Sequence, residues 1–208
     1  MNELLYKIKN LHWTLIFSIF FLSMVGLVMI FSATREEGLN ATFSQITKLL
    51  FGFLIMFFVS LININTWQKY SFFLYLIGIL ILVYATFYGF IGKGSRRWIN
   101  VLGVNIQPSE IMKIFLILAL AKFFDERKIE NFKEYVFLLI PIFLIAFPFS
   151  IILNQPDLGT ALILLSLGVV VFFVSGINIR FFLVSFLLFL SSTPFLWNLL
   201  HEYQKQRL

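Results

Sequence analysis

The sequence is notable first for what it has little of. It has no cysteine, so it can form neither a disulfide nor a thiolate metal site. Its two histidines, His12 and His201, lie near opposite ends of the chain, which argues against a histidine-based metal site or catalytic triad. Charged residues make up only 12% of the 208 positions, against about a quarter in a soluble domain. We therefore do not expect an ordinary soluble fold.

Apolar residues dominate instead. They make up 60% of the chain, 28 of them phenylalanine, and the mean hydropathy is +0.94. A helix needs about 20 such residues to cross the hydrocarbon core of a bilayer, and lipid admits spanning segments only as helices or closed barrels. The sequence predicts an all-α, polytopic membrane protein with a single membrane domain over residues 1–208 and no soluble domain. Seven stretches are long enough to span: Thr14–Thr34, Leu49–Trp67, Tyr70–Ile91, Pro108–Phe124, Tyr135–Asn154, Leu158–Ile177 and Phe181–Leu200.

The basic residues bear on orientation and partners. The net charge of +6 indicates contact with the anionic headgroups of membrane lipids rather than with nucleic acid. With the N-terminus inside, eight Lys and Arg residues fall in inner segments and seven in outer ones. If Lys93, Arg96 and Arg97 bind a ligand and are set aside, four remain outside. The positive-inside rule then predicts a cytoplasmic N-terminus.

Three positive charges and a tryptophan lie together between the third and fourth predicted spans: Lys93, Arg96, Arg97 and Trp98. Arg and Trp are common anchors at a membrane interface. Arginine is also the residue suited to bidentate contact with phosphate, and this loop falls on the predicted outer side, against the usual bias. The sequence leaves both interpretations open: an interfacial anchor, or a site for an anionic substrate.

Two similar motifs begin the fourth and sixth predicted spans, Gln107-Pro108-Ser109-Glu110 and Gln155-Pro156-Asp157. Proline suits the first helical position and an acid suits the first turn, so both motifs serve as ordinary helix starts. Glutamine, however, is not a favoured N-cap, and its recurrence needs another reason. Both spans also start on the side of the membrane that carries Arg96–Trp98. We therefore expect the three segments to converge on one face.

Glu110 and Lys113 lie within the fourth predicted span. They are three residues apart, so they share a helix face and can pair. Ionisable residues at membrane depth usually mark a function. The pair is open to two interpretations, a structural ion pair between helices or the polar wall of a substrate cavity.

Three ordered blocks resemble the signatures of the SEDS family, the family of RodA, FtsW and SpoVE, and two further segments, Gly26 to Ala33 and Tyr203 to Arg207, resemble RodA more than FtsW. The three blocks are Gly94-Ser95-Arg96-Arg97-Trp98-Ile99, Gln107-Pro108-Ser109-Glu110-Ile111-Met112-Lys113, and Asn154-Gln155-Pro156-Asp157-Leu158-Gly159-Thr160-Ala161. The likeness covers essentially the whole chain.

The resemblance implies a peptidoglycan glycosyltransferase in the bacterial inner membrane that serves cell wall elongation and cell shape. Its substrate would be lipid II, the undecaprenyl-pyrophosphate-linked disaccharide peptide, and its partner a class B penicillin-binding protein. The resemblance assigns substrate binding to Arg96, Arg97, Trp98, Gln107, Glu110, Lys113 and Asp157. The cofactor is left open, a divalent cation included.

The same resemblance implies that this chain is an N-terminal fragment. The family has about ten spans, and its proposed catalytic aspartate belongs to a later extracytoplasmic loop that would follow Leu208. We therefore expect no activity from the fragment alone. Two alternatives stay open, a flippase or transporter for lipid-linked precursors and a structural scaffold of the cell-wall synthesis complex. A flippase should carry charges through the whole membrane depth, whereas here Glu110 and Lys113 lie near one face.

Overall fold

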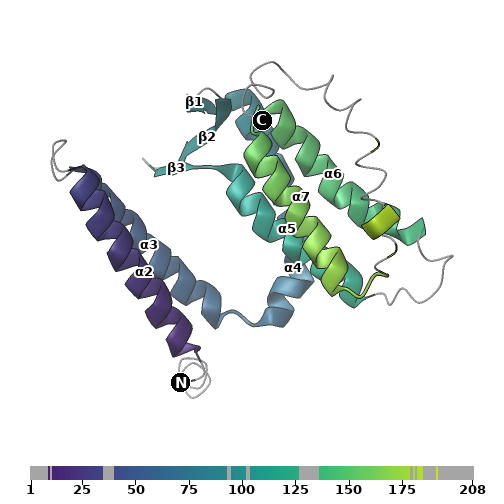
Figure 1. The fold of residues 1–208 in the computed structure, drawn as a ribbon, viewed down its shortest axis with the longest axis horizontal. Coiled ribbons are helices and arrows are strands. Elements are labelled where there is room, and N and C mark those ends of the chain that lie inside the picture. The colour runs from purple at the N-terminus through teal and green to yellow at the C-terminus, as the bar shows by residue number, and fades with distance from the viewer. Residues whose placement is uncertain are drawn as a thin grey trace. The chain divides into compact units, whose positions relative to one another are not determined.

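The computed structural model describes residues 9, 11–34, 40–92, 95–101, 104–126, 136–178, 180, 182–184 and 191. The described residues divide into two compact units, over 1–66 and 67–208. The elements appear in Figure 1 in this order: α2 (Trp13–Ala33), α3 (Asn40–Leu61), α4 (Ile64–Tyr88), β1 (Phe90–Gly92), β2 (Ser95–Val101), β3 (Val104–Ile106), α5 (Pro108–Asp125), α6 (Leu139–Asn154) and α7 (Leu158–Val174).

The first unit is built on the pair of helices α2 and α3, which lie side by side (Figure 1). α2 carries no charged residue over its 21 positions, and none of them is buried. The rings of Phe20 and Phe53 join the two helices, with centroids 6.0 Å apart. A helix that is apolar on all sides suits a membrane, because lipid solvates every face of it.

The second unit packs α4, α5, α6 and α7 around a common apolar core. Its fully buried side chains include Leu82 of α4, Leu116 of α5, Ile152 of α6 and Leu164 of α7. Gly168 lets α6 and α7 approach closely, because a Cβ there would lie 2.5 Å from Ile145 Cδ1. Interhelical contacts in membranes favour small residues for this reason.

A three-stranded antiparallel sheet connects α4 to α5, in the order β1-β2-β3. The sequence predicts a loop in this segment, and that prediction is wrong. Ile91 pairs with Arg96 and Phe90 with Trp98, so Arg97 is an extra residue with no counterpart in β1. Such a bulge breaks the alternation of side chains and re-aims the extra one.

Among the described residues, four helices are long and apolar enough to cross a membrane: Trp13–Ala33, Ala41–Leu61, Ile64–Tyr88 and Val136–Asn154. They confirm the first, second, third and fifth predicted spans. The second and third were placed too far along the chain, because hydropathy does not register the polar first turns of α3 and α4. α4 ends at Tyr88, before Gly89 and the strand that follows.

The fourth and sixth predicted spans are also helices. α5 carries Glu110, Lys113, Lys122 and Asp125, and α7 is 17 residues long. Most of the seventh, residues 181–200, lies outside the described residues. The description as a helical, polytopic membrane protein is confirmed. The single membrane domain stays a prediction.

Candidate functional site

Asp157 is the centre of a polar network at the start of α7. It is the N-cap of that helix, and its Oδ1 accepts a hydrogen bond from the backbone N–H of Thr160 at 3.4 Å. The Thr160 hydroxyl donates to Oδ2 at 2.8 Å. An N-cap aspartate satisfies an otherwise unpaired N–H and places its charge at the positive end of the helix. The carboxylate is thus fixed to its own helix from two directions.

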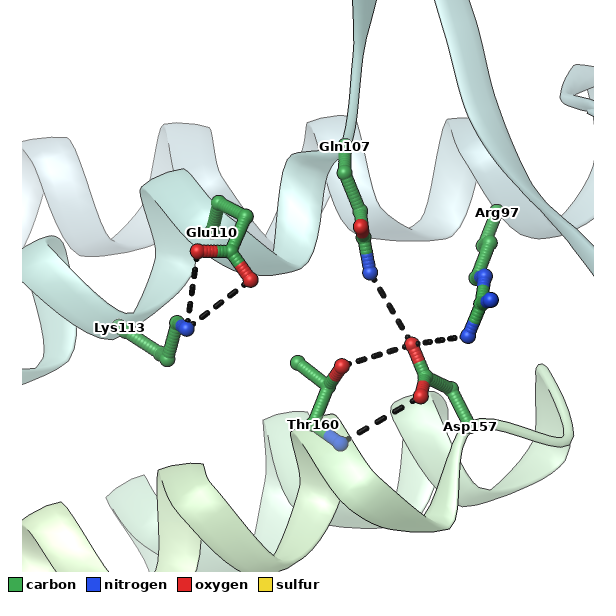
Figure 2. A network of polar contacts seen from close by, with 6 residues as sticks. All are labelled: Arg97, Gln107, Glu110, Lys113, Asp157 and Thr160. Atoms are coloured by element: carbon green, nitrogen blue, oxygen red, sulfur yellow. Dashed lines mark hydrogen bonds and ion pairs between the residues drawn. The ribbon is translucent and has the colours of Figure 1, made fainter. Parts of the chain in front are cut away.

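Two further donors reach the same Oδ2 atom from other elements. The Arg97 Nη1 of β2 lies 2.7 Å from it. The Gln107 Nε2, at the start of α5, donates to it at 3.0 Å. Figure 2 shows the three donors Arg97, Gln107 and Thr160 meeting on Asp157. The predicted convergence of the basic segment with the two helix starts is confirmed.

The ion pair between Arg97 and Asp157 is largely removed from solvent. The two side chains are 18% and 9% exposed. Removing two charges from water costs free energy that only good geometry and additional hydrogen bonds recover, and Gln107 and Thr160 provide those bonds to Asp157. Arg97 is less completely paired, because its Nε is buried and has no hydrogen-bond partner in the structure.

The recurring glutamine now has a physical reason. Gln107 is the N-cap of α5 by position, yet its side chain does not cap the helix and turns to Asp157 instead. Gln155 is 3% exposed and donates to the Leu82 carbonyl at 3.1 Å and to the Thr86 hydroxyl at 2.7 Å. One glutamine therefore joins α5 to α7, and the other joins the end of α6 to α4.

Glu110 and Lys113 form the ion pair that their spacing predicts, with Lys113 Nζ 2.9 Å from Glu110. Both residues belong to α5, so the pair does not join two helices. The Glu110 side chain is 57% exposed and that of Lys113 16%. Figure 2 shows the pair farther along α5 than Gln107, apart from the donors around Asp157.

Arg96 and Trp98 have other contacts. Arg96 Nη1 donates to the Phe87 carbonyl at 3.1 Å, in the last turn of α4, where a positive charge complements the helix dipole. The Trp98 indole covers Gly92 so closely that a Cβ there would lie 2.7 Å from Cδ1 of the ring. The structure thus separates the two neighbouring arginines, Arg96 at the end of α4 and Arg97 at Asp157.

Metal ligands are not clustered in the part of the chain that the structure describes. No group of three or more His, Asp or Glu residues there could hold an ion. The charged groups of the network are one carboxylate and one guanidinium, with amide and hydroxyl donors around them. These donors hold the Asp157 carboxylate in place. Asp157 uses only Nη1 of Arg97, which leaves other guanidinium donors for an anion.

A family model described as cell cycle protein, of the FtsW, RodA and SpoVE type, matches residues 13–208. The chain belongs to this family. The peptidoglycan glycosyltransferase MrdB of Escherichia coli K12 is 31% identical over 196 residues, which cover 93% of this chain and 52% of MrdB. The stage V sporulation protein E of Bacillus subtilis is 36% identical over 168 residues, 76% of this chain and 46% of that protein.

Solved structures of the FtsW, RodA and SpoVE family share the fold. One chain, from a structure on the coordination of polymerization and crosslinking by a peptidoglycan synthase complex, is 31% identical with a TM-score of 0.83. The match covers 95% of this chain and 58% of that one. The rod shape determining protein RodA of Thermus thermophilus is 30% identical with a TM-score of 0.73, over 85% of this chain and 57% of RodA. The chain spans about half the length of the curated relatives it matches.

Three polar residues with contacts in or near this network were not predicted from the sequence. Thr160 and Gln155 lie in the Gln-Pro-Asp block but were not selected, and Thr86 lies in an apolar helix without any motif. The unexplained recurrence of glutamine was the signal that could have drawn attention to Gln155. No sequence signal identified Thr86.

Proposed function

We propose that the protein containing this chain is a peptidoglycan glycosyltransferase that polymerises glycan strands from lipid II, for cell wall elongation and cell shape. Family membership and the names of the relatives support this function. The observation that carries it is Arg97, whose guanidinium lies at the shared end of α5 and α7, contacts Asp157 through Nη1 alone and belongs to a side chain that is 18% exposed. A pyrophosphate group is the ligand that the remaining guanidinium donors suit.

The distribution of charge favours a site open to one side. α6 and α7 contain no charged residue, and α5 has none between Lys113 and Lys122. A flippase would guide a phosphate through the middle of the membrane, where an unpaired charge is costly. The helices α5, α6 and α7 offer it no such path. The charges of α5 lie toward its two ends instead.

We place the Arg97 network on the extracytoplasmic side of the bacterial inner membrane, with the N-terminus in the cytoplasm. Since the chain has no cysteine, single cysteines at Asn105 and Glu126, both exposed, can be labelled from one side. An impermeant maleimide added to whole cells should label position 105 and leave position 126 unlabelled. Labelling of both positions, or of 126 alone, would contradict this orientation.

The partners that we propose follow from the same function. They are lipid II, surrounding membrane lipids, and a class B penicillin-binding protein that would cross-link the new strands; we propose no contact with nucleic acid. In this proposal Arg97, Gln107, Glu110, Lys113 and Asp157 belong to the substrate site, while the catalytic acid lies in a later part of the full-length protein.

The test is polymerisation of lipid II by the full-length protein in proteoliposomes, with its partner present and glycan strands resolved on a gel. We expect strands from the unmodified protein, none from Arg97→Gln, and normal strands from Lys122→Gln, a matched loss of a cation at the other end of α5. Transfer of lipid II across the bilayer without strands would identify a flippase. Neither strands nor transfer from a folded complex would indicate a scaffold.

A further inference from the structure

We infer that Asp157 is a positioning residue, which holds the Arg97 guanidinium through Nη1 so that the donors it leaves over bind the substrate pyrophosphate. This inference rests on the proposed function and changes the role of Asp157 within it. Asp157 would act through Arg97 and would not contact the substrate itself.

The charge of Asp157 argues against direct contact with an anionic substrate. A carboxylate repels a phosphate group, and a water-poor site strengthens that repulsion. The side chain is 9% exposed, and its Oδ2 already accepts from Arg97, Gln107 and Thr160. Its Oδ1 accepts the Thr160 backbone N–H. The carboxylate is therefore engaged within the protein on both oxygens.

The guanidinium of Arg97 is used on one side only. Asp157 contacts Nη1 through a single oxygen, Oδ2. The Nε–H is buried and has no hydrogen-bond partner in the structure. Leaving a buried charged donor unpaired costs free energy, and arginine presents its donors in a rigid plane. Fixing Nη1 therefore restricts the orientation of the whole guanidinium plane.

The dependence between the two residues runs one way. Without Arg97, Asp157 keeps its donors from Gln107 and from the Thr160 hydroxyl and backbone. Without Asp157, Arg97 loses the one ion pair that the structure gives it. Arg97 is moreover the bulged residue of β2, which no residue of β1 opposes. The strand alone does not fix this side chain, and Asp157 supplies the missing constraint.

A double-mutant cycle tests this role in the full-length protein, purified in nanodiscs, with undecaprenyl pyrophosphate as the binding probe. Arg97→Gln should weaken binding strongly, and the probe concentration is raised until its Kd is measurable. Asp157→Asn should raise the Kd by about tenfold. Arg97→Gln with Asp157→Asn should bind no worse than Arg97→Gln alone, because a residue that acts through Arg97 has no effect once Arg97 is gone.

Thr160→Val provides a milder variant in case Asp157→Asn folds poorly. It removes one donor to Asp157 and keeps the shape of the side chain, so the Kd should rise by about two- to fivefold. The matched control is Thr86→Val, whose hydroxyl contacts Gln155 and not Asp157; its Kd should equal that of the unmodified protein.

The outcomes separate the inference from the proposed function. If Arg97→Gln binds the probe normally, Arg97 does not hold the pyrophosphate and both ideas fail. If Arg97→Gln loses binding while Asp157→Asn and Thr160→Val keep it, the positioning role is wrong and the proposed function stands. Additive losses in the double variant would mean that Asp157 contributes to binding independently of Arg97, which also overturns the inference.

Discussion

Each end of α5 has a hydrogen bond from a glutamine to an aspartate, but the two aspartates differ in burial. At its start, Gln107 donates to Asp157, which also pairs with Arg97 across elements. At its end, the Gln68 side chain of α4 donates to Asp125. We call these the sheet end and the far end. The sheet end gathers several donors on a carboxylate that is 9% exposed, whereas Asp125 at the far end is exposed.

The burial of the acidic residues separates the two ends, since Arg97 and Lys122 are similarly exposed, at 18% and 20%. Lys122, at the far end, lies 3.8 Å from Glu126 and 5.3 Å from the ring centroid of Phe72, and Glu126 is 57% exposed. Exposed pairs of this kind contribute little stability, because solvent screens them and the side chains lose entropy. A buried charge needs its partners. The sheet end should therefore respond strongly to single substitutions, and the far end weakly.

The largest effect is expected from Asp157→Ala, compared with Asp125→Ala. The first leaves Arg97 without its counter-charge and α7 without its cap, so unfolding of the full-length protein should become easier by about 3–5 kcal/mol. The second should cost about 0–1 kcal/mol. The two changes in stability are measured by heating the purified variants in detergent and recording the loss of monodisperse protein. Equal losses would remove the distinction between the ends.

A smaller difference is expected between two glutamines. Gln155→Ala removes two buried hydrogen bonds, to Leu82 and Thr86, and should destabilise the protein by about 1–3 kcal/mol. Gln68→Ala removes one hydrogen bond, to the exposed Asp125, and should cost less than about 1 kcal/mol. The same heating experiment compares them. A costlier Gln68→Ala would mean that the far end is held as firmly as the sheet end.

The smallest effect is expected from the pair of Glu110 and Lys113. The two residues form an ion pair within α5, in which the Glu110 side chain is 57% exposed. Lys113→Met should therefore change stability by only about 0–1 kcal/mol. Because this loss of stability is small, adding Glu110→Gln should leave the stability of the Lys113→Met variant nearly unchanged. If folded yield is normal in this double variant and strand synthesis by the full-length protein is absent, the pair has a functional role. If strand synthesis in the double variant recovers together with the folded yield, the pair has a structural role.

The sequence predicted the helices and the meeting of the polar segments well, because both follow from local patterns. Apolar runs of span length identify helices, and two helices that start on one side bring Gln107 and Asp157 to the same face. The spacing of Glu110 and Lys113 predicted their contact within one helix.

The sheet could not be predicted in this way. β1 and β3 have three residues each, too few for an alternating pattern to be recognised. The bulge at Arg97 depends on the register between two strands, which no residue of β2 alone determines. For the same reason the sequence could not assign Arg96 to the end of α4 and Arg97 to Asp157.

The central claim is that Arg97 binds the anionic group of a lipid-linked substrate, and a comparison of Arg97→Lys with Arg96→Lys tests it most directly. Lysine keeps the charge and can anchor at an interface, but it lacks the planar edge that holds a phosphate. The measurement is the affinity of each full-length variant for lipid II at equal membrane yield. We predict that Arg97→Lys weakens binding by about 1.5–3 kcal/mol, while Arg96→Lys, at a helix end, binds normally. Equal, small changes at both positions would show that the segment is an interfacial anchor and would contradict the claim.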